Sequence, residues 1–485
     1  MKNKSVIKNS FYYVLYRLVN VLYPLVTATY VSRVLEPDGV GEISLAQTIV
    51  VFLVACALLG IPNYGVREVS KLKTKEDRGK LFFELFIINA ISTLSLIIIY
   101  FTLINLFDLN INRNLYNIEG IILILNFINV DWFYQGMEEF KYITIRSCIV
   151  KVVSIFAIFI FVKDKSDICN YALIFALAYA GNYIFNLINL RKYINFNCIK
   201  KLRPKKHIKN VLLLAITYIS NEIYVTIDSI MLGFMSDNTQ VGYYSNAMKL
   251  IKILINVLTA IGVALLPRIS FLRSNNKNKE VYFLIEKIIK ILMFITIPSM
   301  IGISLVSNDL VVILFGKAFQ PSKTILIILS LLIIFRTFSN LFLQILISDN
   351  RDKNVSLTYF FAMVLNIILN LIFIPKFEAN GAAFASIISE FCILIMLYKD
   401  SKKYNPIKFD KNNIKILIVS NVIMSLIVVS ISFVKMNLII KLIVQITSSV
   451  FVYILINYIL NNEVIIDIIK IIKEKRKNNV IKCRK

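Results

Sequence analysis

The feature that most constrains this chain is a long series of apolar runs, each about as long as a membrane is thick. A transmembrane helix needs about 20 mostly apolar residues. Of the 485 residues, 58% are hydrophobic, and the mean hydropathy is +0.72. Soluble domains are usually only about 45–50% apolar, and a soluble fold of this length could not bury so much apolar surface. The sequence therefore predicts an all-α polytopic membrane protein.

The apolar runs predict fourteen transmembrane helices, near residues 10–32, 41–62, 81–103, 118–136, 147–162, 168–190, 210–234, 241–266, 288–306, 323–347, 355–374, 379–398, 414–434 and 442–460. The segments on one side of these helices carry 40 lysine and arginine residues, and those on the other side carry 9. Because cytoplasmic loops are enriched in lysine and arginine, we expect both termini in the cytoplasm. The same rule explains the net charge of +26 without a nucleic-acid partner.

An internal repeat relates the two halves of the chain at an offset of 201 residues. "VGEISLAQTIV" (40–50) aligns with "VGYYSNAMKLI" (241–251), and at the same offset Asn20 meets Asn221. Six predicted helices separate the copies, so both copies enter the membrane in the same direction, as in some transporter halves. We expect two six-helix bundles in parallel repeat, with a cleft between them, followed by two C-terminal helices.

This organisation divides the chain into five parts. They are an N-terminal bundle (1–190), a basic cytoplasmic linker (191–209), a C-terminal bundle (210–400), helices 13 and 14 (401–460) and a basic cytoplasmic tail (461–485). The amphipathic tail either lies on the anionic inner leaflet or is a frayed charged end. None of the six cysteines forms a CxxC pair and the single histidine lies in a basic loop, so the sequence predicts no metal site and no cofactor.

Polar residues follow one face of each of three predicted helices. Steps of three and four residues connect Tyr13, Arg17, Asn20, Pro24 and Thr27 in the first helix, Thr217, Asn221, Tyr224 and Asp228 in the seventh, and Ser245, Lys249, Lys252, Asn256 and Thr259 in the eighth. Such spacing places the residues on one helical face. Because unpaired polar groups are costly in lipid, we expect these faces to line a wet cleft.

The charges inside the spans allow two interpretations. Asp228 and Lys249 lie at similar depths and can neutralise each other, and Glu390 can pair with any of the cations, so both carboxylates are assigned to coupling or to structural ion pairs. For Arg17 and Lys252 we expect a cationic cavity instead, and Arg336 fits either role. Arginine and lysine are good donors to phosphate oxygens. The predicted anion-binding residues are therefore Arg17, Lys249, Lys252 and Arg336, with the amides of Asn20, Asn221 and Asn256.

Five motifs, occurring in order along most of residues 5–400, resemble those of polysaccharide flippases of the Wzx type. These flippases belong to the multidrug/oligosaccharidyl-lipid/polysaccharide (MOP) exporter superfamily. The motifs are "LGIPNYGVREVSK" (59–71), "DWFYQGMEEFKYITIR" (131–146), "DSIMLGFMSDNTQVGYYSNAMKLIKI" (228–253), "LLPRIS" (265–270) and "NGAAFASIISE" (380–390).

The resemblance implies a transporter rather than an enzyme. Such proteins carry an undecaprenyl-diphosphate-linked oligosaccharide from the inner to the outer leaflet of the bacterial plasma membrane, for O-antigen, capsule or exopolysaccharide assembly. The implied mechanism is alternating access through a cationic cleft, driven by a cation gradient or the membrane potential. In related lipid II flippases, cations on helices 1 and 8 serve the cleft, and these correspond to Arg17 and to Lys249 or Lys252. The implied partners are the lipid-linked saccharide, membrane lipid, and the polymerase and chain-length regulator of the same pathway.

Other transported substrates and one class of enzyme are the alternatives. A lipid II flippase or a multidrug exporter of the same superfamily has the same fold, although the usually cationic passenger of a multidrug exporter favours an acidic cleft. A membrane-embedded polysaccharide polymerase or glycosyltransferase needs catalytic groups on a sizeable outer loop. The longest predicted outer loop, 104–117, offers only Asp108 and Arg113.

Overall fold

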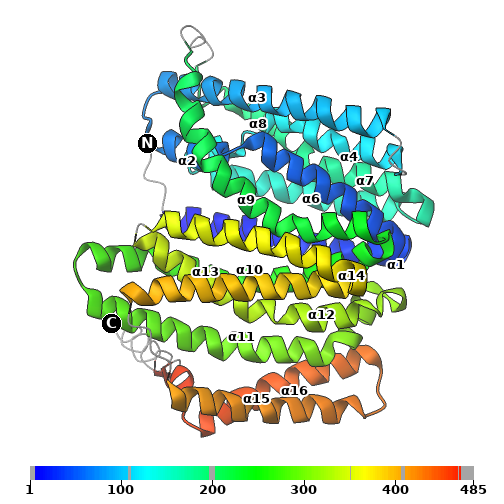
Figure 1. Cartoon of the computed structure of the whole chain (residues 1–485), viewed down its shortest axis with the longest axis vertical. Helices are drawn as coiled ribbons and strands as arrows, with labels where there is room; N and C mark the ends of the chain where they lie inside the picture. The colour runs from blue at the N-terminus through cyan, green and yellow to red at the C-terminus, as the bar shows by residue number, and fades with distance from the viewer. Residues whose placement is uncertain are drawn as a thin grey trace, which may run out of the picture. The chain divides into compact units, whose positions relative to one another are not determined.

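The computed structural model describes residues 6–107, 111–195, 202–349, 351–405, 410–467 and 469–470 (Figure 1). Over these ranges the chain is built from helices and no strand occurs. Ten of the helices in the described ranges are long and apolar enough to cross a membrane. The predicted class, an all-α polytopic membrane protein, is confirmed, whereas the number of fourteen spans and the side on which the termini lie stay predictions.

The chain separates into two compact units. The first, unit 1, comprises residues 1–245 and 366–382, and unit 2 comprises residues 246–365 and 383–485. Unit 1 contains helices α1 (Val6–Leu58), α2 (Ile61–Lys71), α3 (Lys75–Leu106), α4 (Arg113–Leu125), α5 (Asp131–Gly136), α6 (Phe140–Phe161), α7 (Ile168–Ala176), α8 (Tyr183–Leu190) and α9 (Lys205–Met235). Helix α1 packs against α6 and α9, and α2 packs against α5.

Unit 2 is built on one long helix, α11. Its helices are most of α10 (Asn238–Ser274), α11 (Asn278–Phe315), α12 (Ser322–Ser330), α13 (Leu332–Ser348), both ends of α14 (Asp352–Tyr404), α15 (Lys411–Ser432) and α16 (Leu438–Ile459). Helix α11 contacts α12, α13, α15 and α16, and the antiparallel pair α15 and α16 can be followed in Figure 1.

Two of the helices each join two predicted spans across a single non-helical residue. Glu36 (φ 56°) interrupts α1, and Glu378 (φ 50°) interrupts α14. Pro37 directly follows the first break, and proline is favoured at the start of a helix because its missing N–H has no partner there. The break at Glu36 lies between the predicted spans 10–32 and 41–62, and a single non-helical residue separates them in place of a loop.

The predicted span 118–136 is wrong as a single helix. Helix α4 ends at Leu125, a 3₁₀ turn covers Asn126–Ile128, and α5 begins at Asp131. Side chains from α3 take part in the break, because the Asn89 amide donates to the Asn126 carbonyl (3.1 Å) and the Asn126 amide donates to Thr93 Oγ1 (3.0 Å). The first of these hydrogen bonds satisfies a backbone carbonyl where the helix ends, and the second holds the Asn126 side chain against α3.

The predicted span 168–190 is also irregular. A π-helical segment, Leu177–Gly181, lies between α7 and α8. Single π-helical turns widen a helix locally and are frequent at functional sites. Both irregular segments lie in unit 1.

Residues at the 201-residue offset meet each other inside unit 1. Ser44 Oγ donates a hydrogen bond to Ser245 Oγ at 3.1 Å. A Cβ built on Gly41 would lie 2.9 Å from the nitrogen of Gly242 and 1.6 Å from the carbonyl oxygen of Asn238. The reciprocal contact also exists, since a Cβ on Gly242 would lie 2.1 Å from the carbonyl oxygen of Pro37. Equivalent residues thus pair around a local two-fold axis, as a parallel repeat requires.

Candidate substrate-binding site

The polar face of α1 meets a lysine of α6. The side chain of Arg17 lies outside the described part of the chain, whereas that of Asn20, one turn further on, is exposed. Asn20 Oδ1 accepts a hydrogen bond from Lys151 Nζ, and Asn20 Nδ2 donates to the Tyr16 carbonyl (2.7 Å). The Lys151 ammonium also lies 5.3 Å from the centre of the Tyr23 ring, a cation–π distance. Lys151 is therefore a cation of this face that the sequence-based set omitted.

The stripe on α9 is exposed at one end and buried at the other. Asn221 is exposed, while Asp228, two turns further along, is buried. Asp228 accepts hydrogen bonds from Tyr244 Oη (2.9 Å) and from Asn370 Nδ2 (2.7 Å). This carboxylate is thus held in the protein interior by neutral donors from α10 and α14, and its pairing with Lys249 stays a prediction.

Three predicted residues share one face of α10. Lys249, Lys252 and Asn256 lie on successive turns, and the side chains of Lys252 and Asn256 are exposed. Lys249 is partly covered, and its Nζ donates to Oδ1 of the buried Asn246 at 3.1 Å. Placing two cations and an amide on consecutive turns produces a line of donors that an anionic group can follow.

In unit 2 the structure brings Arg336 and Glu390 together. Arg336 Nε lies 3.9 Å from Glu390 Oε2, and the glutamate side chain is only 2% exposed. The sequence alone left Glu390 free to pair with any cation, and Arg336 is the cation it meets. A buried carboxylate with an arginine at this distance avoids the cost of an uncompensated charge.

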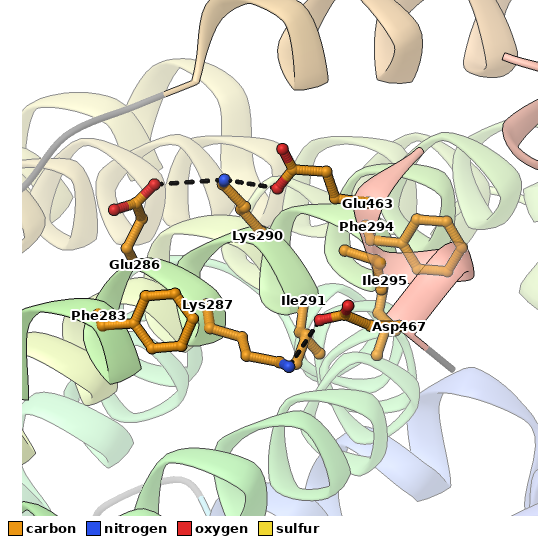
Figure 2. Close-up of a pocket in the computed structure, with 10 residues that line it drawn as sticks. Phe283, Glu286, Lys287, Lys290, Ile291, Phe294, Ile295, Glu463 and Asp467 are labelled. Atoms are coloured by element: carbon orange, nitrogen blue, oxygen red, sulfur yellow. Dashed lines mark hydrogen bonds and ion pairs between the residues drawn. The ribbon is translucent and has the colours of Figure 1, made fainter. Parts of the chain in front are cut away.

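A separate pocket of about 320 Å³ lies between the start of α11 and the short helix that follows α16 (Figure 2). Its walls are apolar, with Phe283, Ile291 and Phe294 among them. Two lysines of α11 close its rim, because Lys287 pairs with Asp467 (2.6 Å) and Lys290 pairs with Glu463 (2.8 Å). These pairs fasten the segment after α16 to α11.

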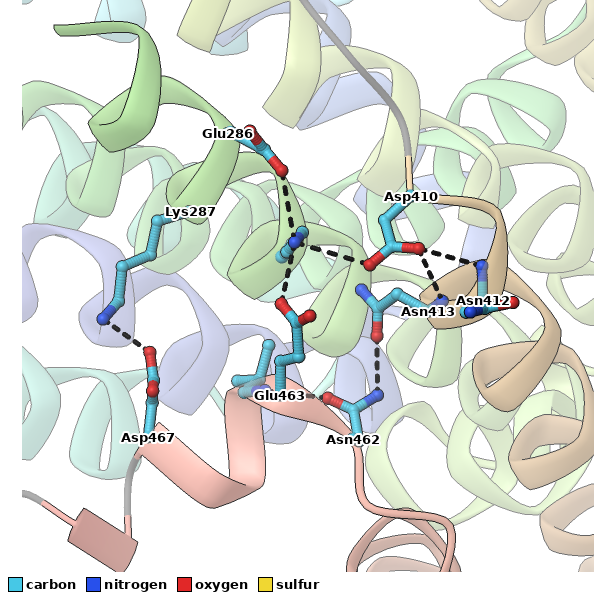
Figure 3. A network of polar contacts seen from close by, with 10 residues as sticks. Glu286, Lys287, Asp410, Asn412, Asn413, Asn462, Glu463 and Asp467 are labelled. Carbon is cyan, nitrogen blue, oxygen red and sulfur yellow. Dashed lines mark hydrogen bonds and ion pairs between the residues drawn. The ribbon is translucent and has the colours of Figure 1, made fainter. Parts of the chain in front are cut away.

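Lys290 is the centre of a larger polar network, whose members Glu286, Asp410 and Glu463 can be followed in Figure 3. Lys290 also lies 3.2 Å from Glu286 and 3.5 Å from Asp410. Burial acts to raise the pKa of Asp410, but hydrogen bonds from the backbone of Asn413 and Asn412 and the nearby Lys290 outweigh it and lower the pKa. The carboxylates of this network are satisfied by groups of the chain itself. It is therefore a structural clamp, and the predicted tail beyond residue 470 lies outside the described residues.

An all-helical chain with many apolar spans, and with cations and amides set inside those spans, belongs to the class of multi-pass membrane transporters. The family model described as "Polysaccharide biosynthesis protein" matches residues 6–273, more than half of the chain. The protein is thus a member of the polysaccharide biosynthesis family of the MOP exporter superfamily. A second model of that superfamily, MatE, matches residues 214–372.

Curated relatives match most of the chain. A protein of Escherichia coli K12 named "Putative O-antigen transporter" is 26% identical over 401 residues, which cover 81% of this chain and 95% of that protein. The "Capsular polysaccharide biosynthesis protein CapF" of Staphylococcus aureus is also 26% identical, over 81% of this chain and 98% of that protein. These relatives are named for transport and polysaccharide synthesis, and the resemblance found in the motifs is confirmed.

Solved structures show the same fold. The "Lipid II flippase MurJ, inward closed conformation" superposes with a TM-score of 0.75 at 17% identity, covering 95% of this chain and all of that chain. An inward-facing MATE multidrug transporter superposes with a TM-score of 0.66 at 14% identity, covering 79% of this chain and 93% of that chain. At these identities the likeness concerns the fold, which is one of transporters rather than enzymes.

Proposed function

We propose that this protein is a flippase for undecaprenyl-diphosphate-linked oligosaccharide repeat units. It moves them from the inner to the outer leaflet of the bacterial plasma membrane, where they serve the assembly of O-antigen, capsule or another exopolysaccharide. Both termini are cytoplasmic in this proposal, and the transport cycle alternates access to a cationic cleft. The observation that carries the proposal is the similarity to the O-antigen transporter, which extends over 95% of that protein.

The cations inside the spans suit the diphosphate of such a substrate. Lys249 and Lys252 lie on consecutive turns of α10, and Lys151 adds a third ammonium group on α6 beside Asn20. Ammonium groups and amides are effective donors to phosphate oxygens. We assign Arg17, Lys249, Lys252, Arg336, Asn20, Asn221 and Asn256 to substrate binding, and Asp228 and Glu390 to coupling or to structural pairing.

The proposed partners are the lipid-linked oligosaccharide, the surrounding membrane lipid and other proteins of the same pathway. In this proposal the saccharide is built on its lipid carrier at the inner leaflet, so a glycosyltransferase that acts on the lipid carrier supplies the substrate. The polymerase and chain-length regulator of the same pathway use the exported unit. Lipid II is the second candidate substrate, because the superposition on the lipid II flippase covers 95% of this chain.

The test of this function is made in cells that synthesise the matching repeat unit. The gene is deleted and restored as wild type, Lys252→Ala, Lys252→Arg or Lys317→Ala, with expression checked for each. Lys317 is an exposed residue of the 3₁₀ turn after α11 and serves as the control. The measured quantities are the lipid-linked repeat unit on the inner leaflet and the polymer on the cell surface.

We expect wild type, Lys252→Arg and Lys317→Ala to restore surface polymer, and Lys252→Ala to reduce the rate of export about tenfold or more. That factor corresponds to the roughly 1.5–3 kcal/mol of one hydrogen bond to a charged group. If wild type fails to restore polymer but relieves a block in lipid II transport, the lipid II function replaces the proposed one. Equal export by Lys252→Ala and wild type refutes the assignment of Lys252.

A further inference from the structure

A cavity of about 260 Å³ is lined by residues of unit 1, and none of the stripe residues of α10 is among the lining residues described. Part of its lining is apolar and comes from the 51–58 segment of α1. Polar and aromatic residues make up most of the rest, with Asp131, Trp132, Gln135, Tyr179, Tyr218 and Glu222 among them. The volume is near the lower end of the ~300–1,000 Å³ range of small-molecule sites.

The two irregular segments of unit 1 both contribute to this cavity. Tyr179 belongs to the π-helical segment between α7 and α8. Asp131, Trp132 and Gln135 belong to α5, which begins after the break at Asn126. Non-helical backbone at membrane depth is tolerated where it is buried in protein or lines a water-filled cavity. Residues at both interruptions of the predicted spans therefore line the same cavity.

The carboxylate of Asp131 is held in a fixed position. Its Oδ1 accepts hydrogen bonds from Arg146 Nη2 (2.9 Å) and Asn186 Nδ2 (2.7 Å), and Arg146 in turn donates to the Asn186 amide oxygen. The Arg146 side chain is 5% exposed. Trp132, at 4% exposure, is fixed as well, because its ring lies against Gly65 and stacks on Phe82. Asp131 and Trp132 are therefore held in place by other groups of the chain.

This combination of groups matches a sugar ring. Carboxylate and amide groups exchange hydrogen bonds with several hydroxyl groups at once, and aromatic side chains offer apolar surface with a polar edge. An anion is disfavoured, since none of the described residues that line the cavity is lysine or arginine. A metal ion is disfavoured too, because Asp131 already pairs with Arg146 and no group of three or more His, Cys, Asp or Glu side chains gathers in the described chain.

We infer that this cavity of unit 1 is the binding site for a saccharide residue of the passenger, separate from the cations that take its diphosphate. The inference rests on the proposed function, since it assigns the sugar part of that substrate. Asp131, Gln135 and Glu222 bind sugar hydroxyl groups, and the tyrosines pack on the apolar face of the ring. The cavity then distinguishes one saccharide repeat unit from another, whereas the cations bind the diphosphate that all such lipid-linked saccharides contain.

The test uses the purified full-length chain and two probes. The first probe is the free saccharide, released by mild acid from the lipid-linked unit that accumulates in the deletion strain. The second is undecaprenyl diphosphate without sugar. Trp132 is the only tryptophan of the chain and lines the cavity, so its emission reports on occupancy. The variants are Glu222→Ala, Gln135→Ala and Tyr218→Phe. The last of these removes only a hydroxyl group. The control is Glu76→Ala, at an exposed position of α3.

We expect the saccharide to change the Trp132 emission of wild type and Glu76→Ala in a saturable manner. Glu222→Ala and Gln135→Ala should weaken this binding at least tenfold, and Tyr218→Phe several-fold, with binding of the sugar-free lipid unchanged. Equal saccharide binding by the variants and wild type, or a response to sodium ions but not to saccharide, overturns the inference. The export assay in cells tests the proposed function separately. If wild type restores export there, the proposed function stands whatever the binding assay shows. If wild type fails to restore export, the proposed function is refuted.

Discussion

The close approach of α1 and α10 at Gly41 leads to a sharp prediction. An added Cβ at Gly41 would lie 1.6 Å from the carbonyl oxygen of Asn238, and real Cβ contacts essentially never fall below 3.0 Å. The obstructing atoms are backbone atoms of α10, so no side-chain rotation relieves the clash. Gly41→Ala therefore requires α1 and α10 to separate by more than 1 Å.

The expected cost has two parts. Overpacking a well-packed contact costs about 1–3 kcal/mol and occasionally more. The separation also stretches the Ser44–Ser245 hydrogen bond (3.1 Å), and hydrogen bonds between membrane helices contribute roughly 0.6 kcal/mol on average. We expect Gly41→Ala to lower the free energy of unfolding by about 3 kcal/mol, and Gly242→Ala to have a similar effect because its Cβ meets the Pro37 carbonyl oxygen at 2.1 Å.

The assay is thermal unfolding of the purified protein, followed through the emission of the single tryptophan, Trp132, which lies in the same unit. The matched control is Gly302→Ala in α11, where an added Cβ meets nothing within 4 Å. That change should be neutral, or stabilising by about 0.5–1 kcal/mol, since alanine is the better helix former. The double variant Gly41→Ala/Gly242→Ala should cost less than the sum of the single changes, because one separation of the helices accommodates both.

Two results would refute this reasoning. One is a Gly41→Ala protein that unfolds at the wild-type temperature, which would mean that the two helices do not approach as closely as described. The other is an equal loss of stability in Gly302→Ala, which would show that the effect is general to helix glycines and not specific to this contact.

Three further predictions concern buried or clustered charges. Arg146→Met leaves the Asp131 carboxylate without its cation and should lower the free energy of unfolding by about 3–5 kcal/mol. The same unfolding assay measures this change, and a decrease below about 1 kcal/mol contradicts the stabilising role of the pair. Lys290→Met should release the segment after α16, so that trypsin cleaves at Lys470 sooner than in wild type, and an unchanged cleavage rate argues against the clamp. Lys151→Met should reduce export in cells while Lys151→Arg retains most of it, and equal export by both variants removes Lys151 from the proposed diphosphate site.

Much of the fold could be predicted from the sequence because membrane spans are governed by local composition. The apolar runs located the helices, and the gap between the predicted spans 10–32 and 41–62 located the break at Glu36. The break at Asn126 could not be predicted in this way. The residues that take part in it, Asn89 and Thr93, lie on another helix, and the polar residues Asn126, Asn129 and Asp131 do not by themselves distinguish a break from a polar helix face.

The candidate site was predictable only as a set of residue types. The three- and four-residue spacing placed Lys249, Lys252 and Asn256 on one face of a helix, and the described structure agrees with that spacing. The sequence could not select Arg336 as the partner of Glu390, because pairing depends on which helices are neighbours. Lys151 was also missed. Its position within the predicted span 147–162 could have marked it as a candidate, but the sequence does not show that it contacts Asn20.

The reciprocal contacts of Gly41 with Asn238 and of Gly242 with Pro37 are those of two identical subunits in a symmetric dimer. At this contact the chain therefore behaves as a dimer whose subunits have been fused into one polypeptide. Fusion removes the requirement that both copies carry the same side chain at equivalent positions. One copy can keep Pro37 where the other has Asn238, and α1 and α10 can carry different polar residues while the shared glycine contact stays. A duplicated protein can in this way retain a symmetric joint and still become asymmetric in what it binds.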